Sequence, residues 1–212
     1  MKKLTVSLIA LSALTATSAM AGDAFSYAKG AATWSHTKSG YLQDRGSDQD
    51  SHGKRDFGGV TLDLSHSFAN NVYGRVGTEY TSRSSGNDSL FLYGAGVGAF
   101  TPLSTGFNLY AEAGLMGYSL ERELADDVNG WDVIARKRSG SLYAETGLRY
   151  EVGDLELSTA YRYAKMTKDM NDFKVGAAYK LAPNWALTAD YTYRHWDLQQ
   201  GSITSLGVKY SF

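Results

Sequence analysis

The chain has no cysteine, only two prolines and no long hydrophobic run beyond its first residues. Without cysteine it cannot form disulfides, thiolate metal sites or a lipid anchor attached through cysteine. No later apolar stretch approaches the roughly 20 residues that a membrane-spanning helix needs. The chain also has no excess of either charge, since it contains 21 basic and 22 acidic residues. A nucleic-acid partner, which requires a basic excess, is therefore not expected.

The N-terminus has the pattern of a cleaved secretory signal peptide. Two lysines follow the first methionine, residues 4–14 are mostly apolar, and residues 19–21 read Ala-Met-Ala, a typical cleavage site. The apolar run is too short to anchor the chain as a membrane helix. We predict a signal peptide over residues 1–21, which leaves residues 22–212 as one mature domain of 191 residues (212 minus 21).

Strand-like alternation runs through almost all of the mature chain, which is rich in glycine and tyrosine. Most alternating segments have ten or more residues, the length that a tilted membrane strand needs, whereas strands of soluble sandwiches usually have about five or six. The inward face is clear in most segments but open in the first and fourth. In the first, either Lys29 or Trp34 could point inward. The ten predicted strands cover approximately residues 24–36, 56–69, 71–82, 89–101, 106–120, 138–152, 155–167, 172–182, 185–196 and 202–212.

The connections between the predicted strands alternate in length. Those after the second, fourth, sixth and eighth strands are short or turn-rich, as at Gly153-Asp154 and Pro183-Asn184. Two of the others, 37–55 and 121–137, are long and polar. Short turns at one end and longer loops at the other are typical of outer-membrane barrels. We predict an all-β fold, a closed antiparallel up-and-down transmembrane β-barrel, with both termini in the periplasm and the long loops outside.

Aromatic residues fall at two levels along these strands, where a membrane barrel carries its aromatic girdles. Eight residues separate Trp185 from Tyr193, which corresponds to about 20 Å of height in a tilted strand. A lipid-facing band is about 25 Å tall. Packing in a soluble core is the alternative, but it would not sort aromatic residues to both ends of the strands. The predicted girdles are Phe68, Phe107, Tyr150, Tyr179, Trp185, Tyr210 and Phe212 on the periplasmic side, and Tyr80, Phe91, Tyr161, Tyr163, Phe173, Tyr191 and Tyr193 on the outer side.

The positions that alternation turns inward carry six acidic and seven basic residues. This balance predicts ion pairs across the lumen, because an isolated buried charge costs several kcal/mol. Such a network could make a rigid polar core or line a narrow channel. A ten-stranded barrel is close in size to the eight-stranded barrels whose interior is filled by side chains, which argues against a wide diffusion pore. The predicted lumen network comprises Asp63, Arg75, Glu79, Glu112, Glu145, Arg149, Glu156, Arg162, Lys174, Lys180, Asp190, Arg194 and Lys209.

The chain ends in the pattern polar-x-Gly-x-x-aromatic-x-Phe. Ser205, Gly207, Tyr210 and Phe212 occupy its defined positions. This ending resembles the C-terminal signal by which the barrel assembly machinery recognises outer-membrane clients. The resemblance implies that machinery as a partner during biogenesis.

More broadly, the mature chain resembles the small outer-membrane β-barrel superfamily of OmpA/OmpX-like, opacity-type and porin-family proteins. The resemblance rests on the sequence segments 90–98 (LFLYGAGVG), 189–194 (ADYTYR) and 207–212 (GVKYSF). It implies location in the outer membrane of a Gram-negative-type bacterium, among its lipids and lipopolysaccharide. The implied roles are envelope integrity, adhesion to a host or cell-surface ligand, or slow solute passage. The usual member has eight strands, so eight is the alternative to our ten.

Catalytic and metal-binding motifs are missing. The four histidines lack ligand spacing, and in Ser65-His66-Ser67 alternation turns His66 to the lipid and both serines inward. An outer-membrane hydrolase is conceivable, but such enzymes have strands that project well beyond the membrane, and none is predicted here. We expect a non-enzymatic protein without metal or cofactor, either structural or adhesive through its extracellular loops, with a narrow channel as the alternative. The acidic and histidine residues predicted near the outer rim are Asp126, Asp127, Asp169, Asp172, His195 and Asp197.

Overall fold

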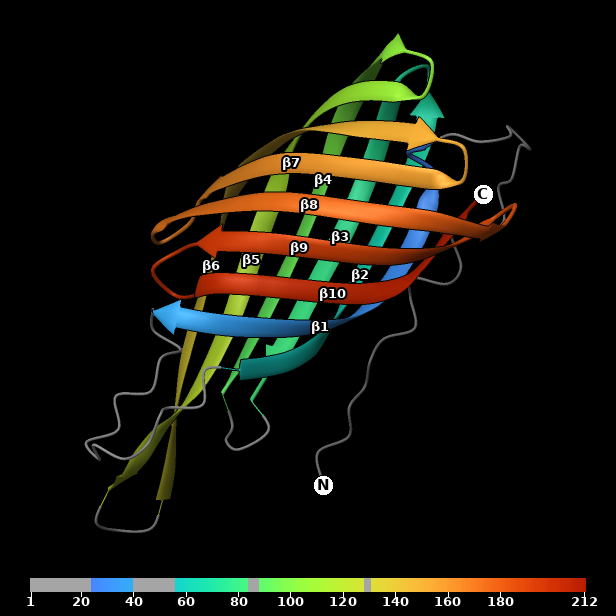
Figure 1. Cartoon of the computed structure of the whole chain (residues 1–212). Helices are drawn as coiled ribbons and strands as arrows, with labels where there is room; N and C mark the ends of the chain where they lie inside the picture. The colour runs from blue at the N-terminus through green and yellow to red at the C-terminus, as the bar shows by residue number, and fades with distance from the viewer. Residues whose placement is uncertain (1–23, 40–55, 84–87, 128–130) are drawn as a thin grey trace.

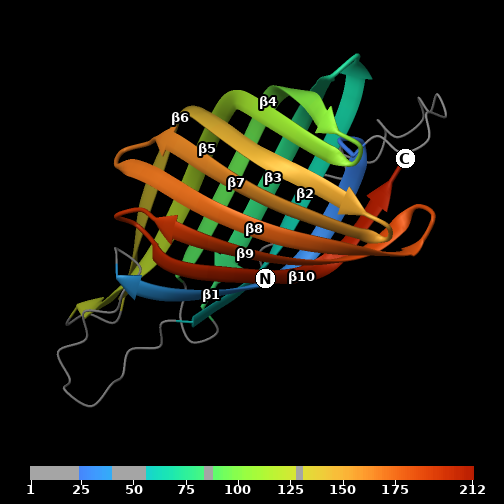
Figure 2. The same cartoon turned by 45° about the horizontal axis from the view of Figure 1, so that its top comes forward.

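Ten antiparallel strands form one closed barrel in the computed structural model. Each strand pairs with its neighbours in sequence, and β1 pairs with β10 to close the ring. In Figure 1 the tilted strands β7 to β10 cross in front of β2 to β6, and Figure 2 shows β1 beside β10. The predicted ten-stranded up-and-down barrel is confirmed, and the eight-stranded alternative is wrong. The structure describes residues 24–39, 56–83, 88–127 and 131–212. At residues 39, 122–127 and 131–135 it describes the backbone but not the side chains.

The strand bounds agree closely with the alternating segments except around the predicted loop 121–137. Two predicted features, the signal peptide at 1–21 and most of the loop 37–55, lie outside the described residues. The strands are β1 (Tyr27–Ser39), β2 (Asp56–Ala69), β3 (Val72–Ser82), β4 (Ser89–Ser104), β5 (Phe107–Asp127), β6 (Trp131–Val152), β7 (Leu155–Lys165), β8 (Asp169–Ala182), β9 (Trp185–His195) and β10 (Gln200–Ser211).

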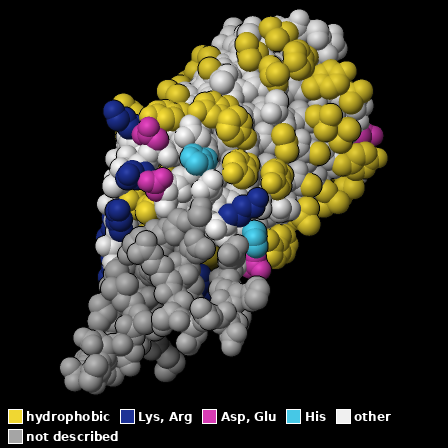
Figure 3. Space-filling model, turned by 60° about the vertical axis from the view of Figure 1, so that its left-hand side comes forward, with side chains coloured by type: hydrophobic (Ala, Val, Ile, Leu, Met, Phe, Trp, Pro, Cys, Tyr) yellow, Lys and Arg dark blue, Asp and Glu magenta, His cyan; other side chains and the backbone are white. Residues whose placement is uncertain are grey.

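The outer surface of the barrel is a hydrophobic wall. Alternation turns side chains such as Leu62, Leu115 and Leu142 outward, and they are 59%, 66% and 69% exposed. Figure 3 shows hydrophobic side chains over much of the face in view, with most of the charged and histidine side chains on that face nearer one end. A wall in contact with hydrocarbon needs every backbone N–H paired within the protein, and closure of the ring supplies those partners. Among the described residues, no helix has the length and apolarity to cross a bilayer.

The two strands whose faces alternation left open are resolved by their contacts. Lys29 of β1 points into the lumen, whereas Trp34 is 54% exposed on the wall. In β4, Leu90 and Leu92 are buried inside, and Phe91 is exposed outside. The residues that follow in β4 at inward positions are glycines, which carry no apolar signal, and this explains why the pattern was ambiguous.

Residues 121–137 are mostly strand, so the predicted loop is wrong. β5 and β6 stay paired beyond Glu121 and Arg136, up to Asp127 and Trp131. The neighbouring strands pair only as far as Glu121 on one side and Tyr143 on the other. The two strands therefore project past the barrel as a ribbon, at the lower left of Figure 1, contrary to the expectation that no strand projects. Backbone pairing alone extends them, and it can form whatever the side chains are, so hydrophobic alternation is not required to mark them.

The two ends of the barrel differ. The end with the four short turns, where β1 begins and β10 ends, is called the turn end, and the opposite end, with the projecting ribbon, is called the hairpin end. Asn71, Gly106 and Gly153 have positive φ of 63°, 76° and 59° in three of these turns. At Gly106 a Cβ would lie 2.4 Å from the carbonyl oxygen of Glu151, so only glycine fits there.

Candidate functional site: the filled lumen

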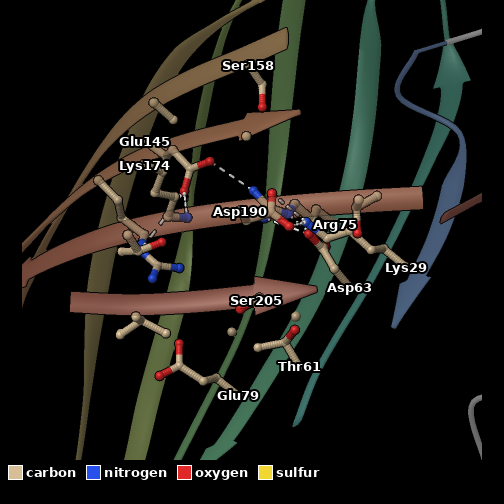
Figure 4. A pocket seen from close by; sticks show the side chains of 18 of the residues that line it. Lys29, Thr61, Asp63, Arg75, Glu79, Glu145, Ser158, Lys174, Asp190 and Ser205 are labelled. Carbon is tan, nitrogen blue, oxygen red and sulfur yellow. Dashed lines mark hydrogen bonds and ion pairs between the residues drawn. The ribbon is translucent and has the colours of Figure 1, made fainter. Parts of the chain in front are cut away.

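The centre of the lumen holds a group of ion pairs around Arg75 of β3. Its guanidinium donates to both carboxylate oxygens of Asp63, at 2.8 and 2.7 Å, and to Glu145 Oε1 at 2.9 Å. Lys174 donates to the other oxygen of Glu145 at 2.6 Å. These four residues come from β2, β3, β6 and β8, so their contacts cross the interior (Figure 4). Charge-assisted bonds of this kind lock opposite walls together.

A second group lies around Arg194 of β9, nearer the hairpin end. Arg194 donates to both oxygens of Asp172, at 2.9 and 3.1 Å, to both oxygens of Glu79, at 2.8 and 3.0 Å, and to Gln199 Oε1 at 2.8 Å. All five guanidinium N–H groups are thereby used. Arg162 also donates to Asp172, which is fully buried. This satisfies the charges that the interior would otherwise penalise.

The third group, nearer the turn end, contains a cation of a different kind. Lys209 pairs with Glu156 at 2.5 Å and Lys29 with Asp190 at 3.3 Å. Arg149, in contrast, has no carboxylate within ion-pair distance among the described residues. It donates to the Ala24 carbonyl oxygen and to the Tyr27 hydroxyl, the latter at 3.1 Å. Its direct hydrogen-bond partners are thus carbonyl and hydroxyl oxygens in place of a carboxylate.

Twelve of the thirteen predicted network residues line one central cavity of about 190 Å³. Lys180 is the exception, because it is exposed at the turn end and pairs with Glu151 at 3.4 Å. Sequence reasoning left Lys29 undecided and placed Asp172 at the rim, yet both belong with these groups. The signal that could have found Asp172 is its inward register with Lys174, two residues along β8.

Glycines of β4 make room for tyrosines beside the ion pairs. A Cβ on Gly96 would lie 2.3 Å from the Tyr143 hydroxyl, and one on Gly98 would lie 2.4 Å from Cζ of Tyr73. Tyr143 donates to Glu112, which is buried. The glycines are therefore required where large rings from β3 and β6 cross the lumen.

The turn end of the lumen is closed by the segment that precedes β1. Phe25 is fully buried, and its ring stacks on Phe100 at 4.2 Å and on Tyr73 at 4.7 Å, with Tyr110 edge-on at 5.7 Å. Ser65 Oγ donates to the Phe25 carbonyl oxygen at 2.6 Å. The sequence pattern placed residue 25 within a strand and gave no sign that it enters the lumen.

The hairpin end is closed by an apolar cluster that includes two connecting loops. Trp196 and Leu198, between β9 and β10, are buried in it together with Met166 from the β7–β8 connection and Met170 at the start of β8. The Trp196 indole N–H donates to the Lys168 carbonyl oxygen at 3.2 Å, and its ring meets Tyr118 edge-on at 4.9 Å. Apolar closures at both ends therefore flank the charged centre.

The residues considered for a hydrolase do not come together. Asp172 is inside the lumen, His195 is exposed on the other face of the same wall, and Asp197 pairs with Lys168 at 3.3 Å. Asp169 is exposed at the start of β8, while the side chains at 126 and 127 lie outside the described residues. In the described part of the chain, no cluster of three His, Cys, Asp or Glu side chains could hold a metal ion.

The four residues of the C-terminal pattern lie along β10 toward the turn end. Ser205 faces the lumen, 3.0 Å from the Thr33 hydroxyl, and Gly207 packs so closely on Gly30 that a Cβ would lie 2.1 Å from its carbonyl oxygen. Tyr210 contacts Trp185 on the wall, with ring centroids 4.9 Å apart. The Phe212 N–H donates to the Ser26 carbonyl oxygen at 3.2 Å. Their recognition by the assembly machinery stays a prediction.

Comparisons with known proteins agree with this architecture. The family model described as outer membrane protein beta-barrel domain matches residues 6–212. The outer membrane protease OmpT from Escherichia coli is similar in structure, with 10% identity, a TM-score of 0.50, and coverage of 89% of this chain and 94% of OmpT. At such identity the likeness concerns the fold alone. The search of curated proteins found no match.

Two further solved structures resemble the chain more loosely. Ail, the attachment invasion locus protein of Yersinia pestis in complex with the heparin analogue sucrose octasulfate, is 16% identical with a TM-score of 0.47, over 91% of this chain and 100% of Ail. A porin refined at 1.8 Å is 15% identical with a TM-score of 0.34, over 74% of this chain. The chain spans about half of that porin, 52% of its length.

Proposed function

We propose that this chain, which belongs to the outer membrane protein β-barrel family, is a closed, non-enzymatic barrel that serves envelope structure. Its wall fits the lipids and lipopolysaccharide of a bacterial outer membrane, with the turn end in the periplasm and the hairpin end outside. The observation that carries the proposal is the filled lumen, in which paired charges lie between two apolar closures.

The order of the layers explains why a filled lumen favours structure over transport. A solute entering from the hairpin end first meets the cluster around Trp196, whose mostly apolar side chains replace little of its hydration shell. It would then have to separate pairs such as Arg194–Asp172, which are bound by charge-assisted hydrogen bonds. At the turn end the aromatic group around Phe25 blocks the exit. Ten strands leave little room to bypass these layers.

Single-channel recording in planar bilayers tests the proposal. The mature protein, refolded in detergent and inserted into a lipid bilayer, is expected to give no steady conductance steps. Circular dichroism and the heat-dependent shift of the band on a denaturing gel verify that the inserted protein is folded. Reproducible steps from folded wild-type protein would overturn the proposal and establish the alternative, a narrow channel for small solutes or ions.

A second role, contact with a host or cell surface, is favoured by the projecting β5–β6 ribbon. The strands have 21 and 22 residues and extend beyond the pairing of their neighbours. Extra length of this kind does nothing for the membrane-spanning wall, but it places polypeptide well outside the lipid.

Shortening the ribbon tests this second role. A variant in which a short Asn-Gly turn replaces residues 122–135 keeps the Glu121–Arg136 pair and all barrel pairing below it. Bacteria that display this variant are expected to bind cultured epithelial cells less than bacteria that display the wild type at equal surface amounts. Equal binding would contradict adhesion through the ribbon and would leave the structural role standing.

A further inference from the structure

We propose that residues 24–26 form a removable plug, latched by Arg149, and that its release opens the central cavity to the turn end alone. The inference rests on the proposed closed lumen and adds a second state to it. In the closed state described above the cavity lies between the aromatic group around Phe25 and the cluster around Trp196. In the released state it becomes a pocket open to the periplasm, while the cluster around Trp196 still blocks the other side.

The plug is hydrogen-bonded to β2 and to the residue after β10, but it is not part of a strand. Ser65 of β2 donates to the Phe25 carbonyl oxygen at 2.6 Å, and the Ser67 backbone N–H donates to Ser26 Oγ at 3.1 Å. The Phe212 N–H, just beyond β10, donates to the Ser26 carbonyl oxygen at 3.2 Å. The first ladder pair of β1 is Tyr27 with Ser211. Residues 24–26 can therefore leave without breaking the ladders that close the barrel.

The side chain of Phe25 occupies a preformed aromatic seat. Tyr73, Phe100 and Tyr110 surround it from β3, β4 and β5, with ring centroids between 4.2 and 5.7 Å from that of Phe25. Tyr73 and Phe100 also contact each other, with centroids 6.4 Å apart. A seat whose members hold one another keeps its shape when the plug leaves, so the plug can return to it.

Arg149 connects the plug to the charged centre. Its Cζ lies 4.4 Å from the Phe25 ring centroid, 5.1 Å from that of Tyr27 and 5.7 Å from that of Tyr110, and it also donates to the Ala24 carbonyl oxygen. Cation–π contacts and a carbonyl bond replace the carboxylate that the other lumen cations have. Most of these partners belong to the plug or lie next to it, which makes Arg149 the latch.

The cavity lies directly behind the plug. Arg149, Tyr27 and Tyr110 line it, and so do Ser158 and Lys209. Figure 4 shows Ser158 pointing into the cavity beside the central ion pairs. A pocket of about 190 Å³ lined by both charges would take up water and small polar solutes once one mouth opens.

Thiol labelling tests the plug, because the chain contains no cysteine of its own. Ser158→Cys places one thiol in the cavity, and a small charged methanethiosulfonate reagent reports whether water reaches it. In detergent-folded protein we expect slow labelling with the native plug and at least tenfold faster labelling with Phe25→Ala. The matched control is Phe68→Ala, which removes the same side chain at the same end but from the outer wall, where Phe68 is 61% exposed. It should leave the slow rate unchanged.

A milder variant covers the case in which Phe25→Ala fails to fold. Ser65→Ala removes only the hydrogen bond to the Phe25 carbonyl oxygen, and labelling about two- to fivefold faster than with the native plug is expected. Slow labelling in every folded variant would overturn the plug and leave the closed lumen intact. Fast labelling with the native plug would contradict the closed lumen itself, so the two failures are distinguishable.

Discussion

The guanidinium of Arg194 holds the carboxylate of Asp172 by two hydrogen bonds, 2.9 Å from Nε to Oδ1 and 3.1 Å from Nη2 to Oδ2, inside the barrel wall. The side chains are 1% and 0% exposed. Asp172 also accepts a hydrogen bond from Arg162, and Arg194 also donates one to Glu79. A buried pair of this kind contributes little compared with apolar residues of the same shape, but loss of one partner leaves an uncompensated charge.

Asp172→Asn is therefore expected to lower the free energy of unfolding by about 3–5 kcal/mol, because two buried arginines lose their shared anion. Reversible urea unfolding in lipid vesicles, followed by tryptophan fluorescence, measures the change. Asp197→Asn is the matched control, since the Lys168–Asp197 pair is exposed on both sides and its loss should cost less than about 1 kcal/mol. Equal effects of the two substitutions would show that the lumen pairs do not stabilise the barrel.

The strands and their faces could be predicted because lipid and lumen impose opposite chemistry on alternate residues. Leu142 outside and Glu145 inside follow from their positions in β6. The ribbon at 121–137 was not predicted because its sequence is mostly polar and does not alternate between apolar and polar residues. The Asn129-Gly130 dipeptide, typical of a two-residue hairpin turn, was the available sign.

Gly98→Ala is expected to destabilise the barrel by about 1–3 kcal/mol, because the new methyl group would overlap the Tyr73 ring in a filled interior. The same unfolding measurement applies. Gly30→Ala is the control, since its Cβ would meet only Leu62 Cδ2 at 3.5 Å, an ordinary contact. The cost of Gly98→Ala should shrink when Tyr73 is replaced by leucine. An unchanged cost in that background would mean that the ring is not the reason for the glycine.

The partners inside the lumen could be predicted only in part. Alternation predicts that Arg75 and Glu145 point inward, but it does not predict that they meet each other from β3 and β6 across the lumen. The two closures were missed because Phe25 and Trp196 lie just outside their strands, where period-two patterning ends. Contacts between such segments and distant strands depend on the closed shape and leave no local signal.

Phe212→Ala is expected to reduce severalfold the amount of folded barrel in the outer membrane of producing cells, because it removes the terminal residue of the pattern at Ser205, Gly207 and Tyr210. The heat-dependent gel shift of isolated membranes measures this amount. Refolding of the purified variant in detergent should stay close to that of the wild type, which would separate recognition from stability. Phe68→Ala at the same end of the barrel is the control. Normal assembly of Phe212→Ala in cells would refute the assembly signal.

The most direct test of the closed lumen is the conductance of four proteins compared in one planar bilayer system. They are the wild type, Phe25→Ala, Trp196→Ala and the double variant. Because the two closures lie in series, the wild type and both single variants are expected to be silent. Only the double variant should give steady steps, which are expected to be small because ions must still pass the paired charges of the centre. Steps from the wild type as large as those from the double variant would contradict the account.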